Sequence, residues 1–442
     1  MQASTPSIAA APPSSGLSHE EKRVLWATLV GTAIEWYDFF IYAQAAALIL
    51  APLFLIGLTA DNPALAQILS YATLGISFLF RPLGAIVAGG LGDRYGRKMV
   101  LVLTLILMGA STSLIGLLPT YAQIGIWAPL ALVVLRILQG FSAGGEWGGA
   151  ALLAVEHAPL GRRSLFGSFP QIGVPIGMLL ATAVTLAITL AIGKNAYLAW
   201  GWRIPFLLSI ALIVVGILIR RRVEESPVFT DLRHRRKEAS APLKELIQSH
   251  GGRVLRAALI FVANNAAGYL LLAFLIGYGQ KVLKFDTTQV LWASVIAAIG
   301  WLASTLLGGH LGDRIGRTRI FVIGYVVLAL WAIPMWFIFE TRSLPLFFIG
   351  LLVLSLPLGL TYGPQAALYA EMFPAKVRYS GVAIGYALGA ILGGAFAPMI
   401  AQSIVNATGK AWPIGVYLIV LCIISLSALL TMRDPQGVNL NE

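Results

Sequence analysis

Two carboxylates interrupt an otherwise apolar stretch of the chain. Glu35 and Asp38 lie in "GTAIEWYDFFIY", within a largely apolar run over residues 24–50. A helical rise of about 1.5 Å per residue puts them about 16 and 21 Å from the start of this run, near the middle of a hydrocarbon core about 30 Å thick. A charge at that depth costs at least about 2.5–3.5 kcal/mol on insertion scales. The two groups therefore need compensating partners, and they mark a candidate functional site.

Two arginines are predicted at a similar depth in other apolar runs. Arg81 lies in the run over 65–91 and Arg136 in the run over 127–155. Each is about 15 Å from one end of its run. Acids and bases at one depth can compensate each other, and a bidentate pair of arginine and carboxylate has strong geometry. The sequence therefore predicts a buried cluster of four charges.

This cluster has a chemical and a purely structural interpretation. Glu35 and Asp38 share a helix face, with Tyr42 one turn further along. Burial favours the neutral carboxyl group, whereas a nearby guanidinium favours the charged one. An acid held between these effects can take up a proton when its arginine turns to a substrate anion. Static ion pairs that fix helix register are the alternative, and for Arg81 a kink at the following proline is another.

The composition predicts that these groups lie in a polytopic membrane protein. Of the 442 residues, 58% are hydrophobic and 11% are charged, whereas a soluble domain has about 25% charged residues. The single cysteine excludes an internal disulfide. We therefore predict an all-α membrane protein with 12 transmembrane helices. The predicted spans cover residues 24–50, 65–91, 99–118, 127–155, 165–192, 200–220, 254–280, 288–311, 318–339, 345–371, 380–405 and 411–432.

The distribution of charge predicts orientation and domain boundaries. Most of the 31 lysines and arginines fall on one side of the predicted spans, which the positive-inside rule assigns to the cytoplasm. The net charge of +12 is then explained by orientation in the membrane rather than by binding to nucleic acid. We predict a protein of the bacterial cytoplasmic (inner) membrane with both termini inside. A charged stretch separates two pseudo-symmetric six-helix bundles. The predicted segments are a disordered cytoplasmic tail (1–22), a first bundle (23–220), a cytoplasmic linker (221–253), a second bundle (254–432) and a short tail (433–442).

An internal repeat supports this division. "GGLGDRYGRK" matches "GHLGDRIGRT", and "EHAPLGRRSLFG" matches "EMFPAKVRYSG" further along each half. Aspartate can cap a helix or pair with arginine, so such loops can latch the halves together in one conformation and release them in another. A polar turn at the cytoplasmic face, or for Glu146 a helix-packing charge, is the simpler alternative. The candidate gating residues are Asp93, Arg94, Arg97, Glu146, Glu156, Arg163, Asp313, Arg314, Arg317, Glu371 and Arg378.

The paired loops, the predicted spans and the central linker resemble the major facilitator superfamily. Four further stretches, "EWYDFFIY", "RPLGA", "RILQGFSAGGEWGG" and "WGWRIPF", resemble its metabolite:proton symporter family, which includes carriers of shikimate, α-ketoglutarate, citrate and proline or betaine. The resemblance covers nearly the whole chain and implies the fold and proton-coupled uptake, without identifying the solute. In related sugar porters an acid of the first span pairs with an arginine of the fourth. The matching residues here are Asp38 and Arg136.

The second half carries almost no charge at mid-membrane depth. We predict that the first half handles charge while the second supplies hydrogen bonds and aromatic walls. Neutral polar groups also hold helices together, for about 0.6–2 kcal/mol each, and each candidate has that alternative. The candidate substrate-binding residues are Arg81, Arg136, Tyr42, Gln171, Asn264, Asn265, Tyr269, Tyr362 and Gln365, and the candidate proton-coupling residues are Asp38, Glu35 and Arg136.

Enzymatic and metal-dependent functions find no support in the sequence. The five histidines form no ligand-spaced cluster, no thiol lies beside a base, and no "GxxxxGK" loop is present. We predict no enzyme activity, cofactor or metal, but a monomeric secondary transporter in the lipid bilayer. It would couple protons to the movement of a small organic acid by alternating access. Symport of a zwitterion such as proline or betaine is the first alternative, and proton-driven efflux of a hydrophobic compound is the second.

Overall fold

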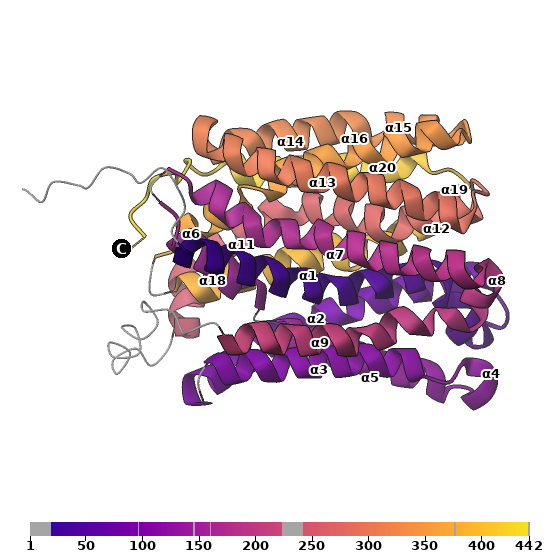
Figure 1. The fold of residues 1–442 in the computed structure, drawn as a ribbon. Helices are drawn as coiled ribbons and strands as arrows, with labels where there is room; N and C mark the ends of the chain where they lie inside the picture. Colours follow the sequence, from indigo (N-terminus) through magenta and orange to yellow (C-terminus); the bar gives the residue numbers. More distant parts are fainter. Residues whose placement is uncertain are drawn as a thin grey trace, which may run out of the picture.

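The chain folds into a bundle of roughly parallel helices (Figure 1). In the computed structural model, α3, α5 and α9 lie at one side of the bundle, α14, α16 and α20 at the other, and α1 and α7 between them. No strand occurs among the described residues. These are residues 19–440 without Gly96, Gly145, Leu160, 223–241, Ala375 and Lys376, and the side chains of Asp93, Arg94, Arg97 and Glu146 are also outside the description.

The helices divide into two sets on either side of residues 223–241. The first half comprises α1 (His19–Leu48), η1 (Ala51–Leu55), η2 (Ile56–Thr59), α2 (Pro63–Tyr95), α3 (Arg97–Leu117), α4 (Tyr121–Ile124), α5 (Trp127–Ala143), α6 (Glu146–Glu156), α7 (Arg163–Ile192), α8 (Lys194–Ala196), η3 (Tyr197–Gly201) and α9 (Arg203–Arg222). The second half comprises α11 (Pro242–Tyr269), η5 (Leu270–Phe274), α12 (Leu275–Lys281), α13 (Thr287–Ile315), α14 (Arg317–Ala332), α15 (Pro334–Glu340), α16 (Leu344–Tyr362), α17 (Gln365–Met372), α18 (Arg378–Gly389), η6 (Ala390–Ala395), α19 (Ala397–Thr408) and α20 (Trp412–Leu430).

Each predicted span has a helical counterpart. Within the described chain, 9 helices are long and apolar enough to cross a membrane. Two further spans are helix pairs bent by 69° after α1 and by 62° before α9, and the shorter apolar segment Val102–Leu117 matches the predicted span 99–118. Pro52 and Pro205 lie early in the second piece of each bent pair. Since proline lacks an N–H and clashes with the preceding turn, it favours both bends.

Two predicted boundaries differ from the structure. α1 begins at His19, so the end of the predicted tail 1–22 is helical; residues 1–18 lie outside the described chain. α11 begins at Pro242, so the last part of the predicted linker 221–253 is also helical. Proline is well suited to the first turn of a helix. The largely polar residues that follow Pro242 extend α11 at its N-terminal end, before its apolar segment begins.

The halves pack closely through α7 and α13. A Cβ atom on Gly309 of α13 would lie 2.8 Å from the Cβ of Ser168 on α7 and 3.0 Å from the carbonyl oxygen of Ser164. Real Cβ atoms do not approach so closely, so this crossing requires glycine at position 309. Further contacts between the halves join α6 to α17 and α18, and α2 to η6 and α19. These contacts position the site that lies between the halves.

Candidate functional site

A small cavity of about 10 Å³, the space of a single water molecule, lies between the two halves. Its aromatic wall comes mostly from the second half, and Trp36 and Val174 contribute from the first. Among the predicted residues, Asn264, Asn265, Tyr269 and Tyr362 lie in this wall. The aromatic lining residues are Trp36, Phe261, Tyr269, Trp301, Tyr362 and Tyr386.

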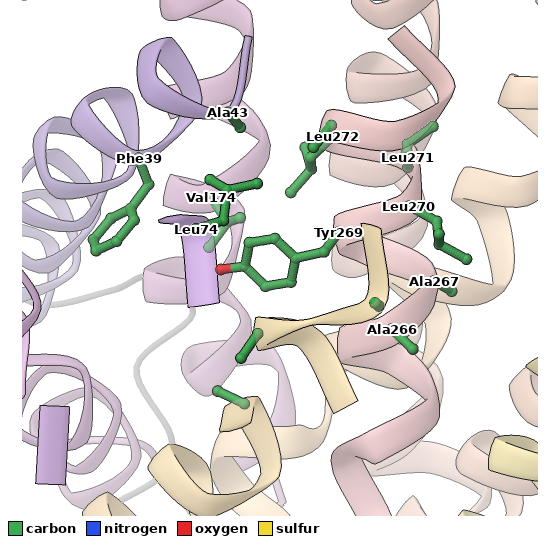
Figure 2. Close-up of a cluster of buried hydrophobic side chains, with 14 of the residues drawn as sticks. Phe39, Ala43, Leu74, Val174, Ala266, Ala267, Tyr269, Leu270, Leu271 and Leu272 are labelled. Atoms are coloured by element: carbon green, nitrogen blue, oxygen red, sulfur yellow. The ribbon is translucent and has the colours of Figure 1, made fainter. Parts of the chain in front are cut away.

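Tyr269 reaches across the interface between the halves. It is the last residue of α11, and its side chain points towards Leu74 and Val174 of the first half (Figure 2). Its ring packs edge-on against Phe78, with the centroids 5.1 Å apart. Its hydroxyl group is buried and has no hydrogen-bond partner among the described residues. The hydroxyl is therefore available to a ligand that lies between the halves.

Asp38 lies on the buried side of α1, against α3 and α9. The residue is only 3% exposed. Ser209 donates a hydrogen bond to its Oδ1 atom at 2.6 Å, and Thr112 donates to its Oδ2 atom at 3.0 Å. A hydroxyl group can both donate and accept. The same two partners can therefore serve the carboxylate and, after rotation of their hydrogens, the protonated acid.

Arg136 of α5 is fully buried and hydrogen-bonded to α2. Its Nε donates to the carbonyl oxygen of Thr73 at 3.3 Å, and its Nη2 donates to the carbonyl oxygen of Leu74 at 3.3 Å and to the hydroxyl of Ser77 at 2.7 Å. Its Nη1 donates to Oε1 of Gln139 at 2.6 Å. Every nitrogen of this guanidinium thus has a partner.

The predicted direct pair of Asp38 and Arg136 is wrong for this structure. The described residues contain no ion pair between them, because the guanidinium bonds to α2 instead. A close crossing of α5 and α2 makes this possible. A Cβ on Gly140 would lie 1.9 Å from the carbonyl oxygen of Ser77, so only glycine allows the α2 backbone to come so near. Arg136 is consequently compensated by backbone carbonyl dipoles as well as by side chains.

Neutral side chains connect the two charges. Gln139 accepts the bond from Arg136 and donates its Nε2 to Oγ1 of Thr112 at 2.6 Å. Thr112 in turn donates to Asp38. Chains of hydrogen bonds polarise one another in a low-dielectric interior. The acid and the base can therefore influence each other through an amide and a hydroxyl without touching.

Tyr42 and Glu35 accompany this network on α1. The ring of Tyr42 lies 3.7 Å from Cζ of Arg136, and its hydroxyl donates to Oγ1 of Thr73 at 2.6 Å. Tyr42 thus packs on Arg136 and is not among the residues that line the cavity. Glu35 is buried, and it lies within electrostatic range of Asp38 and Tyr269.

Arg81 of α2 is buried in aromatic surroundings. Its Cζ lies 4.3 Å from the ring centroid of Phe78, 4.4 Å from that of Phe39 and 5.8 Å from that of Trp36. Only 3% of the residue is exposed. Its Nε and Nη2 have no hydrogen-bond partner among the described residues. Arg81 is not itself among the residues that line the cavity, but it lies beside Trp36, which is.

Gln171 and Gln365 bond to each other across the halves rather than lining the cavity. Nε2 of Gln171 donates to Oε1 of Gln365 and to the carbonyl oxygen of Tyr362, both at 3.1 Å. Trp147 donates to Oε1 of Gln171 at 2.8 Å and stacks on Tyr386 with the ring centroids 3.7 Å apart. These contacts join the halves on the side of the cavity nearer to the start of α7.

The end of the bundle that carries the start of α1 and residue 440, here called the terminal face, holds the predicted latch (Figure 1). Asp313 at the end of α13 accepts hydrogen bonds from the backbone N–H groups of Ser164 at 2.8 Å and Leu165 at 2.9 Å. These N–H groups belong to the first turn of α7, where negative charge is stabilised by the helix dipole. One half therefore caps a helix of the other.

A buried ion cluster lies beside this cap. Glu371 of the second half contacts Arg163 of the first half at 2.8 Å and also contacts Arg317 of its own half. Nε of Arg317 donates to the hydroxyl of Ser164 at 2.9 Å, which ties it to the first half too. Breaking a buried pair leaves an uncompensated charge and costs about 3–5 kcal/mol, so this cluster stabilises the contact between the halves at the terminal face.

The repeated Glu–Arg motifs exchange partners between the halves. Arg163 pairs with Glu371, whereas Arg378 lies 3.9 Å from Glu156. Each arginine thus meets the glutamate of the other repeat. Arg314 is exposed, and the contacts of Asp93, Arg94, Arg97 and Glu146 lie outside the described residues.

The segment after α20 adds to the terminal face. The carbonyl oxygen of Val438 accepts a bond from Nη1 of Arg163 at 2.7 Å, and Oδ2 of Asp434 accepts from the N–H of Thr318 at 3.1 Å. Nε2 of Gln436 donates to the carbonyl oxygen of Asp313 at 3.0 Å. Residues 434–438 thereby cover the latch.

The opposite end of the bundle also joins the halves. The hydroxyl of Tyr71 donates to the carbonyl oxygen of Ala273 at 3.4 Å, and Nζ of Lys281 bonds to Oε1 of Gln67. Lys194 and Asp286 form an exposed ion pair at 3.5 Å. The halves therefore touch on both sides of the cavity, and the site lies between two sets of contacts.

Sequence reasoning missed the neutral members of the site. Thr112, Ser209 and Gln139 are ordinary residues of apolar helices, and nothing in their spacing indicates that they connect two charges. Trp36 lies next to Glu35 in a motif already singled out, so its position could have been inferred from that neighbour. No sequence signal indicates Tyr386.

Comparison with known proteins gives the same architecture. The model of the Major Facilitator Superfamily matches residues 29–398 and 292–441. The inner membrane metabolite transport protein YhjE of Escherichia coli is 38% identical over 433 residues, which cover 95% of this chain and 98% of that protein. The shikimate transporter of E. coli is 35% identical, covering 94% of this chain and 95% of the relative. A solved D-xylose-proton symporter superposes with a TM-score of 0.74 at 19% identity, covering 95% of this chain and 99% of that structure.

Proposed function

The chain belongs to the major facilitator superfamily and is a multi-pass transporter of a small molecule in a bacterial inner membrane, and on this basis we propose that it couples protons to the movement of a small organic acid. It works as a monomer with both termini in the cytoplasm. The two halves, divided near residues 223–241, rock about the central cavity so that the site opens to each side in turn.

The setting of Asp38 is the observation that carries proton coupling. The acid is buried at mid-span, and its partners are two hydroxyl groups that suit either protonation state. A permanently charged structural acid would gain more from a direct arginine partner. The link to Arg136 through Thr112 and Gln139 lets the charge of the acid act on the region beside the substrate cavity.

The unpartnered edge of Arg81 supports an anionic substrate. A buried guanidinium without hydrogen-bond acceptors is costly, and a substrate carboxylate would satisfy it. One of the relatives is named as a shikimate transporter, and shikimate is an organic acid. The contacts of Asp313, Glu371 and Arg163 at the terminal face would break when the site opens there, which fits alternating access.

Symport of a zwitterion such as betaine is the second candidate. The aromatic rings of Trp301, Tyr362 and Phe261 line the cavity, and aromatic faces bind quaternary ammonium groups. The carboxylate of such a solute could still reach Arg81. The two candidates differ in whether a positive group on the solute improves binding.

Proton flux in proteoliposomes tests the proposal. Purified wild type and Asp38→Asn would be reconstituted, and solute-dependent acidification of the lumen would be recorded for carboxylates, proline and betaine. A solute counterflow assay without a proton gradient would measure binding and exchange separately. Asp38→Asn is expected to abolish proton entry while counterflow continues, because the amide occupies the same hydrogen-bonded place but cannot carry a proton.

Two results would contradict the proposal. Proton-coupled uptake that is unchanged in Asp38→Asn would remove Asp38 from coupling. Solute movement without any proton flux in the wild type would make the protein a uniporter or exchanger.

A further inference from the structure

The two buried arginines beside the cavity differ in the edge that could hold a carboxylate. In a guanidinium group, Nε and Nη2 lie on one edge and together form the fork that binds a carboxylate with two parallel hydrogen bonds. From the state of these two edges we propose that the transported solute carries a single carboxylate, bound by Arg81, and that Arg136 does not contact it. This inference rests on the proposed function and narrows its substrate class.

The Nε–Nη2 edge of Arg81 is free of hydrogen bonds within the described chain. The residue is 3% exposed, so water does not replace the missing partners freely. The ring centroids of Phe39 and Phe78 lie 4.4 and 4.3 Å from Cζ of the guanidinium, so its close neighbours include aromatic rings that offer no hydrogen-bond acceptor oxygen. Tyr386, a cavity residue, lies close enough to interact electrostatically with Arg81. The fork thus belongs to a residue that neighbours two lining residues of the cavity, Trp36 and Tyr386, and it lacks an acceptor.

The same edge of Arg136 is filled by the protein itself. Thr73 accepts from Nε, and Leu74 and Ser77 accept from Nη2. Two of these acceptors are backbone carbonyls of α2, which cannot swing away as side chains do. Releasing Arg136 for a second carboxylate would break all three of these hydrogen bonds, two of which hold it to the backbone of α2. A dicarboxylate therefore has no second fork.

The cavity wall itself is neutral and offers donors. Within the described part of the chain it contains no lysine or arginine. Nε1 of Trp36, Nε1 of Trp301 and the hydroxyl of Tyr269 are buried without hydrogen-bond partners there. Donors of this kind match neutral acceptors such as hydroxyl or carbonyl oxygens, whereas a second carboxylate would remain a buried charge without a cation. The solute is accordingly an acid with one carboxylate on a compact body that carries neutral oxygen groups.

Binding to the purified full-length protein tests the inference independently of proton flux. Three compound series, linear, cyclic and hydroxylated cyclic, would each be measured as the monocarboxylate, the dicarboxylate and the neutral carboxamide. Quenching of tryptophan fluorescence would report binding, since Trp36 and Trp301 line the cavity. In each series that binds, the monocarboxylate is expected to bind about tenfold or more tightly than the other two, because each lost or unpaired charged hydrogen bond is costly.

Variants of Arg81 assign the fork. Arg81→Gln is expected to weaken monocarboxylate binding by about tenfold or more, and Arg81→Lys to weaken it less, because lysine keeps the charge but lacks the bidentate edge. Arg342→Gln serves as the matched control, since Arg342 is an exposed arginine remote from the cavity wall. Unfolding temperatures and elution profiles of the variants confirm that each is folded. The comparison of compound series on the wild type stands even where a variant is unstable.

Each outcome decides the inference. The inference is overturned if a dicarboxylate or a carboxamide binds most tightly. It is also overturned if monocarboxylate binding survives Arg81→Gln, or if no monocarboxylate of any series binds. These results would leave proton coupling through Asp38 intact, because that is measured by flux. Conversely, monocarboxylate binding without proton-coupled flux would support the assignment of Arg81 while contradicting the proposed symport.

Discussion

Buried charges are held in two different ways in this molecule. At the terminal face, Glu371 contacts Arg163 directly across the halves. In the middle of the bundle, Asp38 and Arg136 belong to one half and are joined through two neutral side chains. In the proposed rocking mechanism, direct pairs between the halves would break when the halves separate, so they would act on conformation. The hydrogen-bonded side chains of Thr112 and Gln139, here called the neutral relay, lie within one half. They would stay joined during that movement and could respond to protonation of Asp38 instead.

The largest expected effect comes from breaking the direct cluster. Glu371→Gln leaves two buried arginines without their shared carboxylate, which should cost about 3–5 kcal/mol. Hydrogen exchange of the backbone amides at the start of α7 should accelerate, and the unfolding temperature should fall. Glu156→Gln is the matched control. Since the Glu156 side chain is 33% exposed and 3.9 Å from Arg378, its loss should cost about 0–1 kcal/mol. Equal effects of the two substitutions would show that burial does not decide the strength of the latch.

The second-largest effect is expected from disturbing the close contact between α7 and α13 at Gly309. Gly309→Ala places a Cβ 2.8 Å from that of Ser168, and overpacking of this kind costs about 1–3 kcal/mol. Exchange at the start of α7 should again increase, while Gly251→Ala, which meets no atom within 4 Å, should leave it unchanged. Adding Ser168→Gly to Gly309→Ala should restore part of the loss. Absence of any rescue would argue against the α7–α13 contact as the cause.

The neutral relay between Asp38 and Arg136 is tested by removing the hydroxyl group of Thr112. Thr112→Val keeps the shape of the side chain but disconnects Asp38 from Gln139, at a cost of about 0.5–1.5 kcal/mol. Accumulation of solute driven by a proton gradient should fall about threefold to tenfold, while exchange at the terminal face stays as in the wild type. Thr112→Ser retains the hydroxyl and should behave almost like the wild type. If the valine and serine variants accumulate solute equally well, the neutral relay does not carry the coupling.

The smallest effect is expected in the segment after α20. Asp434→Asn weakens the acceptor for the N–H of Thr318 at the start of α14, where a negative charge contributes about 0.3–1 kcal/mol. The unfolding temperature should decrease slightly, and the difference should shrink at high salt because exposed charges are screened. A decrease as large as that of Glu371→Gln would mean that residues 434–438 are a principal part of the latch.

Much of the architecture could be predicted because it depends on local periodicity. Most apolar runs matched the helices to within a few residues, although α11 begins at Pro242, well before its predicted run from 254. The repeated "GDR.GR" motif located Asp313 at an end of the bundle. Helical rise alone predicted that Asp38, Arg81 and Arg136 lie at one depth, and the structure buries all three side chains. Their partners did not follow. The predicted pair of Asp38 and Arg136 failed because the spacing of residues along a helix says nothing about which neighbouring helix approaches most closely.

The sequence by itself determined that charged groups lie buried in a two-part helical membrane protein, because composition, hydrophobic length and internal repetition are properties of the chain. Only the tertiary structure decided what each charge touches. Gly140 lets α2 approach α5 so that backbone carbonyls surround Arg136, while the neighbouring Arg81 keeps an unfilled edge. Two buried arginines of the same half thus differ in their hydrogen bonding, because hydrogen bonding depends on ångström-scale contacts that arise only when the helices pack.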